Sequence, residues 1–187
     1  IPVTDAANIT QSIVNSVTEL VQTSTTAENM IGNFKETMKI YRQGKEYYDR
    51  LRNVTHLVRD ARKVQQSILL VGELSDIYVT SYDKMLTDDN FSSQELSAIA
   101  AGYNKLLERG MNSLKDLKEI VNPTDYSMTD KERLDRIDQA HGELTHTRDL
   151  MVYYTRKNIS VSYLRSQRKN DTQRVLDLYG SADEKYW

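Results

Sequence analysis

The sequence contains no cysteine, and this absence excludes disulfide bridges, thiolate metal sites and cysteine nucleophiles. Proline is also nearly missing, since none occurs between Pro2 and Pro123, and the chain has only seven glycines. Proline removes a helical hydrogen-bond donor, and glycine raises the entropic cost of ordering the backbone. Their scarcity therefore permits very long helices.

Long apolar runs and a dominant charge are missing as well. No apolar run approaches the roughly 18 residues that a membrane-spanning helix needs, so we expect no transmembrane segment. The net charge is −2 and the isoelectric point is near 6.0, so no global positive field attracts nucleic acid. We expect no direct nucleic-acid binding.

Motifs for catalysis and cofactor binding are absent too. His141 and His146 are five residues apart, which turns them to different faces of a helix, and Glu143 with His146 is the only Glu-x-x-His pair. Glycine-rich phosphate loops and the Gly-x-Ser-x-Gly nucleophile elbow do not occur. We expect no enzymatic activity and no catalytic, cofactor-binding or metal-binding residues.

Apolar residues recur at three- and four-residue steps along two segments in the first half of the chain. This spacing is typical of the buried face of an amphipathic helix or coiled coil. The first stripe comprises Ile13, Val17, Leu20, Ser24, Ala27, Ile31, Phe34, Met38 and Tyr41. The second comprises Val54, Leu57, Ala61, Val64, Ile68, Val71, Ser75, Tyr78, Tyr82 and Met85. The stripes are out of phase, so we expect a break, kink or reversal within residues 44–54.

Two capping boxes predict where later helices begin. Ser92 precedes Glu95 by three residues, after a turn-forming cluster at 87–90, and Thr129 precedes Glu132 in the same way. The helix after Ser92 should end before Pro123. Its apolar face comprises Leu96, Ile99, Tyr103, Leu106, Leu114, Leu117 and Val121. The helix after Thr129 has the stripe Leu134, Ile137, Leu144, Met151, Tyr154, Val161 and Leu164, with His141 and Asn158 as polar members.

These features predict an all-α fold, an elongated antiparallel bundle of three to four long helices. A length of 187 residues favours one domain over residues 1–187. Residues 165–174 contain no apolar side chain, so core burial should stop near Leu164. A polar C-terminal extension is therefore expected from about residue 165, as a solvated extension, a loop or a docking surface.

Positive charge is concentrated near the C-terminus, and the only tryptophan is the last residue, Trp187. The cations are Arg156, Lys157, Arg165, Arg168, Lys169 and Arg174. They form either a solubilising face or a docking patch for an acidic partner or a membrane surface. Trp187 is either packed against the bundle or offered to a partner. We take these seven residues as candidate partner-docking residues, and among them Arg165, Arg168, Lys169 and Arg174 should make no buried contact.

Several blocks together resemble a known family. They are residues 19–51, 57–78, 91–108, 127–138 and 153–165, with Leu178-Tyr179-Gly180 and Glu184-Lys185-Tyr186-Trp187 in the tail. The chain resembles the conjugative-transposon TraI proteins of Bacteroides and relatives, which are mating-channel proteins and not the relaxase of the same name. More loosely, it is similar to the helical minor pilus proteins of type IV secretion systems.

The resemblance implies a structural or adhesive component of a conjugative DNA-transfer apparatus that acts through protein–protein contacts. The partners would be other secretion-channel or pilus subunits, and self-association stays open. The protein would be exported to the periplasm or cell surface. A start without methionine fits either a mature form whose signal peptide was removed or a sequence that was simply trimmed. Two alternatives remain: the helical ligand-binding ectodomain of a sensor, and a membrane-active helical protein.

Overall fold

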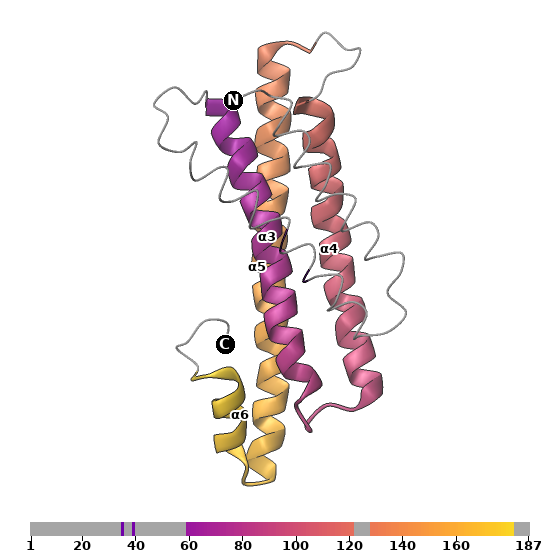
Figure 1. Ribbon diagram of the computed structural model, residues 1–187, viewed down its shortest axis with the longest axis vertical. Helices are drawn as coiled ribbons and strands as arrows, with labels where there is room; N and C mark the ends of the chain where they lie inside the picture. The colour runs from indigo at the N-terminus through magenta and orange to yellow at the C-terminus, as the bar shows by residue number, and fades with distance from the viewer. Residues whose placement is uncertain (1–34, 36–38, 40–58, 122–127, 182–187) are drawn as a thin grey trace.

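The computed structural model describes Lys35, Lys39 and residues 59–121 and 128–181, and over these ranges it is an all-α helical bundle. Helix α3 spans Arg59–Leu86, α4 spans Ser93–Val121 and α5 spans Asp130–Arg168, and the short α6 spans Thr172–Tyr179. Figure 1 shows α3, α4 and α5 side by side, with α4 running opposite to the other two, and α6 folded back along the end of α5. The predicted fold class is confirmed.

Helix α3 supplies the centre of the bundle, as its sequence stripe predicted. Every stripe member whose side chain is described from Val64 onward is buried: Val64, Ile68, Val71, Ser75, Tyr78, Tyr82 and Met85. Leu74 and Ile77 are buried beside them, so the buried face of α3 is wider than one stripe. This width follows from the position of α3, which packs against both α4 and α5.

The two capping boxes form where they were expected. Ser92 N donates to Glu95 Oε2 at 2.8 Å and Glu95 N donates to Ser92 Oγ at 3.2 Å, so α4 begins at Ser93. Thr129 and Glu132 make the same reciprocal pair before α5. Helix α4 is described as far as Val121, which agrees with an end before Pro123.

Four tyrosines form an aromatic layer between the three long helices. The Tyr78 and Tyr103 rings stack with centroids 4.5 Å apart, and Tyr82 and Tyr154 meet Tyr103 edge-on. Their hydroxyl groups have partners: Tyr103 Oη lies 2.6 Å from Thr155 Oγ1, and Tyr82 Oη donates to the carbonyl oxygen of Leu96 at 2.9 Å. Because these buried hydroxyl groups have hydrogen-bond partners, tyrosine can occupy positions in this slim core that phenylalanine would otherwise fill.

The second half of α5 differs from its predicted stripe. Ile137, Leu144 and Met151 are buried as expected, but Val161 is 39% exposed and Leu164 is 59% exposed. Beyond Met151 the buried positions are Thr155, Ile159, Ser162 and Ser166. The prediction was wrong here because three of these four buried positions carry small polar residues, which a search for apolar periodicity does not register.

Core burial continues past Leu164, which corrects the expectation of a polar extension from about residue 165. Ser166 is fully buried near the end of α5, and Val175 and Tyr179 of α6 join the hydrophobic core. Helix α6 returns along α5 after a turn at residues 169–171, where Asn170 adopts a positive φ of 55°. Asparagine tolerates this left-handed conformation better than most residues.

Other sequence predictions fall outside the described residues. They include the first stripe from Ile13 to Tyr41, the break within 44–54, and Trp187. Within the described ranges, none of the helices is both long and apolar enough to cross a membrane.

Candidate docking surface

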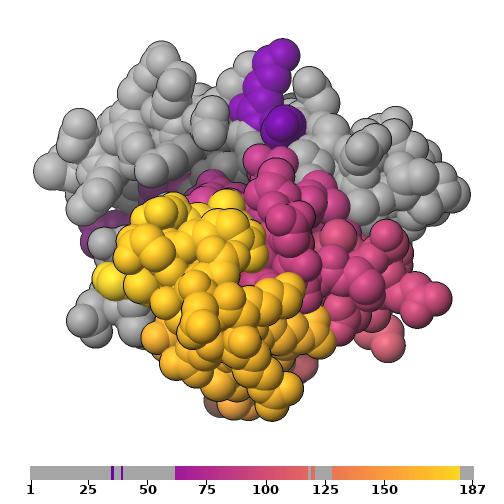
Figure 2. Space-filling view, turned by 90° about the horizontal axis from the view of Figure 1, so that it is seen from below, coloured from indigo at the N-terminus to yellow at the C-terminus, as the bar shows by residue number. Residues whose placement is uncertain are grey.

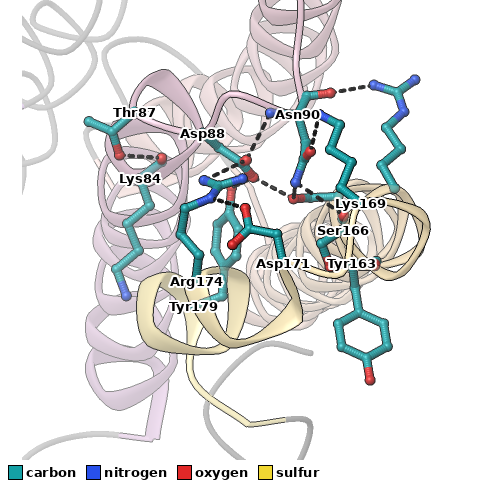
Figure 3. Close-up of polar contacts among 12 residues, drawn as sticks. Lys84, Thr87, Asp88, Asn90, Tyr163, Ser166, Lys169, Asp171, Arg174 and Tyr179 are labelled. Carbon is teal, nitrogen blue, oxygen red and sulfur yellow. Dashed lines mark hydrogen bonds and ion pairs between the residues drawn. The ribbon is translucent and has the colours of Figure 1, made fainter.

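Side chains from four segments meet where the α3–α4 turn, the start of α4, the end of α5 and α6 come together. Figure 2 looks onto this end of the bundle, where α6 and the last turns of α5 lie together beside the α3–α4 segment. The polar side chains that interact here, which we call the end cluster, are drawn in part in Figure 3. The end cluster comprises Asp88, Asn90, Glu95, Ser162, Arg165, Lys169, Arg174 and Tyr179.

Asp88 is the centre of the end cluster, with a side chain that is 0% exposed. Its Oδ2 accepts hydrogen bonds from Ser162 Oγ at 2.5 Å and Tyr179 Oη at 2.7 Å, and its Oδ1 accepts from the backbone N–H of Asn90 at 3.0 Å. Arg174 Nη1 lies 3.5 Å from Oδ1. A buried carboxylate is tolerated when hydrogen bonds and a cation compensate its lost hydration, as they do here.

Asn90 connects the same turn to α5. Its side-chain nitrogen donates to Ser162 Oγ at 3.0 Å, while its side-chain oxygen accepts from Lys169 Nζ at 2.9 Å. The backbone carbonyl oxygen of Asn90 accepts from Arg165 Nη1 at 2.6 Å. The turn is therefore fixed by contacts to residues more than 70 positions away in sequence.

Glu95 and Arg165 form a two-pronged ion pair at the edge of the end cluster, at 3.0 and 2.6 Å. The Arg165 side chain is 39% exposed and the Glu95 side chain is 40% exposed, so water screens the attraction. The hydrogen bonds from Arg165 and from the Ser92 backbone lower the pKa of Glu95 from 4.5 to about 2.

Helix α6 is held by Tyr179 and Arg174. Burial, followed by the hydrogen bond to the Asp88 carboxylate, raises the pKa of the Tyr179 hydroxyl, which stays protonated and donates. Arg174 also bonds to Asp171 at 2.6 Å, just before α6. These contacts stabilise a helix of eight residues, which is too short to persist alone in water.

The structure divides the six cations of the predicted docking patch into two groups. Arg165, Lys169 and Arg174 make contacts inside the end cluster, so the expectation that these cations make no buried contact is wrong for them. The other three, which we call the outward cations, are exposed on α5: Arg156, Lys157 and Arg168. Trp187, the seventh candidate, lies outside the described residues.

The outward cations share their face of α5 with apolar side chains. Tyr153 and Leu164 are each 59% exposed and Val161 is 39% exposed. Lys157 Nζ lies 5.3 Å from the centre of the Tyr153 ring, a cation–π distance. Between Asp149 and Asp171 the sequence contains no acidic residue. This stretch is therefore a basic surface with exposed apolar groups.

Among the described residues, no group of three or more histidine, aspartate or glutamate side chains is placed to hold a metal ion. Asp88, the most buried carboxylate among the described residues, has its oxygens engaged by the hydroxyl groups, backbone and arginine named above. The end cluster can position helices, and its polar atoms are directed at one another.

Sequence reasoning missed the central residues of the end cluster. Asp88 and Asn90 were recognised only as turn formers, and Tyr179 only as part of the tail. One feature of the sequence pointed to such a cluster: residues 165–174 contain more cations than nearby acidic residues. Cations without local acidic partners must interact with distant acidic residues or with water.

Comparison with known proteins gives one family match. Residues 2–34 match the model of a domain of unknown function, DUF4141, which covers a minor part of the chain and lies outside the described residues. No curated protein and no solved structure matches the chain.

Proposed function

We propose that this protein is a non-catalytic structural or adhesive component of a conjugative type IV secretion apparatus, exported from the cytoplasm and acting through protein–protein contacts. The process is inferred from the resemblance to the conjugative-transposon TraI proteins. The action through protein–protein contacts is inferred separately, from the surface of the molecule. The process and the mode of action therefore have separate support.

The observation that carries the contact role is the outward face of α5 from residue 150 to residue 168. It combines exposed Tyr153, Val161 and Leu164 with exposed Lys157 and Arg168, and it has no acidic residue. Exposed apolar side chains in line with cations cost solubility unless a partner covers them. Tyrosine and arginine, present here as Tyr153 and Arg168, are also among the residue types that contribute most to protein interfaces.

The end cluster supports the same role, because it makes one end of the bundle a fixed platform. Arg165 and Arg174 connect α5 and α6 to Glu95 and Asp88 of the opposing segments. An interface built on helices that are already fixed loses less entropy on binding than one built on mobile loops. The face of α5 is thus presented in one orientation.

The test uses transfer between cells. Deleting the gene in a donor strain should abolish conjugative transfer, and the wild-type gene supplied in trans should restore it. Transfer at the wild-type frequency from the deletion strain would overturn the proposed process.

A second arm tests the contact surface. Reversing the two cations of this face to glutamate, in the double variant Lys157→Glu/Arg168→Glu, should reduce transfer by at least about tenfold through like-charge repulsion. A matched control reverses Lys105 and Lys115, which are exposed on α4. Circular dichroism should show equal helicity in both variants. Equal transfer by the two would show that the face of α5 is not the contact surface.

A further inference from the structure

On the face of α5 that points away from α3 and α4, the exposed residues form one straight line along the helix. Eleven positions spaced by three or four residues lie on it, and every one is exposed: Glu132, Asp135, Gln139, Gly142, His146, Asp149, Tyr153, Lys157, Val161, Leu164 and Arg168. From Glu132 to Arg168 is 36 positions, which at 3.6 residues per turn brings the last side chain back to the direction of the first. We call these residues the outer line.

Charge is divided between the two halves of the outer line. The first half carries Glu132, Asp135 and Asp149 and has no lysine or arginine. The second half carries Lys157 and Arg168 and has no acidic residue, and it also holds the exposed apolar side chains. A surface that is acidic at one end and basic at the other is complementary to itself when turned around.

We propose that the outer line is the contact surface between two copies of this chain, packed antiparallel about a two-fold axis near Met151 and Val152. Reversal about this centre maps the positions from Asp135 to Arg168 onto one another to within one residue. The facing pairs are Asp135 with Arg168, Gln139 with Leu164, Gly142 with Val161, His146 with Lys157, and Asp149 with Tyr153. A two-fold interface requires this property, since each pair then occurs twice.

Gly142 gives independent support. It lies in the first half of α5, inside the helix, where glycine is less favourable than alanine, and a Cβ atom added there would meet nothing within 4 Å. Its own chain therefore has no steric need for glycine at this position. In the antiparallel pair Gly142 faces Val161, and a missing side chain opposite a branched one lets two helices approach closely.

A second copy fits the outer line better than a membrane does. A straight helix lying on an anionic surface would bring Glu132 and Asp135 against the same negative charges that attract Lys157 and Arg168. A second copy instead places Arg168 opposite Asp135 at two symmetry-related positions. The inference rests on the protein-contact part of the proposed function and is independent of the conjugative process.

The experiment exchanges charges across the facing pair Asp135 and Arg168. Asp135→Lys and Arg168→Glu are prepared separately in the full 187-residue chain, and self-association is measured by sedimentation at low salt. Wild type should dimerise, and each single variant should dimerise at least about tenfold more weakly, because both symmetry-related pairs become repulsive. An equimolar mixture of the two variants should form a heterodimer. In it, the lysine introduced at position 135 of one variant faces the glutamate introduced at position 168 of the other, and the two native residues form the second attractive pair.

The same sedimentation measurement serves for the control variant and for the results that would overturn the proposal. Glu108→Lys on α4 changes an exposed charge away from the outer line and should leave the dimer unchanged. A wild-type protein that stays monomeric at about 100 μM, a hundred times the dissociation constant of a micromolar complex, would overturn the proposal. A mixture no more associated than the separate variants would also overturn it, as would binding of wild type to phosphatidylserine vesicles without dimerisation. The transfer assay separates the two proposals, because loss of transfer on gene deletion does not depend on whether wild type dimerises.

Discussion

The Glu95 carboxylate performs two tasks at once: it accepts the backbone N–H of Ser92 at 2.8 Å and both guanidinium prongs of Arg165 at 3.0 and 2.6 Å. The first contact caps α4, and the second holds the end of α5 against that cap. A residue that helix-start rules identify from local sequence alone is therefore also a tertiary contact across 70 positions.

Glu95→Gln should make the stability of the protein less dependent on pH in the acidic range. The contacts lower the pKa of Glu95 from 4.5 to about 2 in the folded chain, so their contribution is fully present above about pH 5 and is lost as the pH falls toward 2. The urea midpoint of the variant should therefore lie below that of wild type at pH 7, and the gap should close as the pH falls from 4.5 to about 2. A gap of constant size over this range would contradict the assignment. Repeating the comparison in an Arg165→Gln background isolates the ion pair, because there the gap should be smaller at pH 7.

Asp88→Ala should be strongly destabilising. It removes the acceptor of Ser162 and Tyr179 and leaves Arg174 without its buried partner, and breaking a buried charge network in this way costs about 3–5 kcal/mol. The matched control is Asp89→Ala, an exposed neighbour that should change the free energy of unfolding by no more than about 0.5 kcal/mol. Urea unfolding measures both. Hydrogen exchange should show the amides of α6 losing protection in Asp88→Ala, and equal unfolding of the two variants would show that the end cluster contributes nothing to stability.

Alanine substitutions at two glycines on neighbouring helices should have opposite effects on stability. At Gly102 an added Cβ would lie too close to Tyr154 Oη, so the ring has to move and its 3.2 Å hydrogen bond to the Ile99 carbonyl is lost. We expect Gly102→Ala to destabilise by about 1–3 kcal/mol. Gly142→Ala meets no neighbour and should stabilise the isolated chain by up to about 1 kcal/mol through helix propensity. Thermal unfolding at low protein concentration compares them, and destabilisation of similar size at both sites would contradict the packing around Gly102.

Helix identity and helix starts could be predicted from the sequence because their causes are local. The Ser92–Glu95 and Thr129–Glu132 boxes fix the starts of α4 and α5, and the stripe of α3 is apolar at nearly every buried position. The bundle class follows from these elements and from the scarcity of proline. No distant contact is needed to deduce them.

The end cluster could not be predicted because its causes are distant. Asp88 is buried only because Ser162, Arg174 and Tyr179 reach it from segments that are far away in sequence. The cations of residues 165–174 likewise have the composition of a solvated face until Asp88, Asn90 and Glu95 are placed beside them. Charge counts show that partners are needed but do not identify them.

The last prediction tests where the buried face of α5 lies beyond Met151. The apolar stripe continued from Met151 places Val161 and Leu164 inward, whereas the structure buries Ile159 at 3% exposure and leaves Leu164 at 59%. Ile159→Ala should therefore destabilise by about 2–5 kcal/mol, because it leaves a cavity in the core, while Leu164→Ala should stay within about 0.5 kcal/mol. The two substitutions are similar in chemistry and lie on the same helix, so helix propensity nearly cancels between them. Urea unfolding is measured at low protein concentration, where any contribution of Leu164 to self-association is suppressed. A larger loss from Leu164→Ala would restore the predicted stripe and would mean that Ser162 faces away from Asp88.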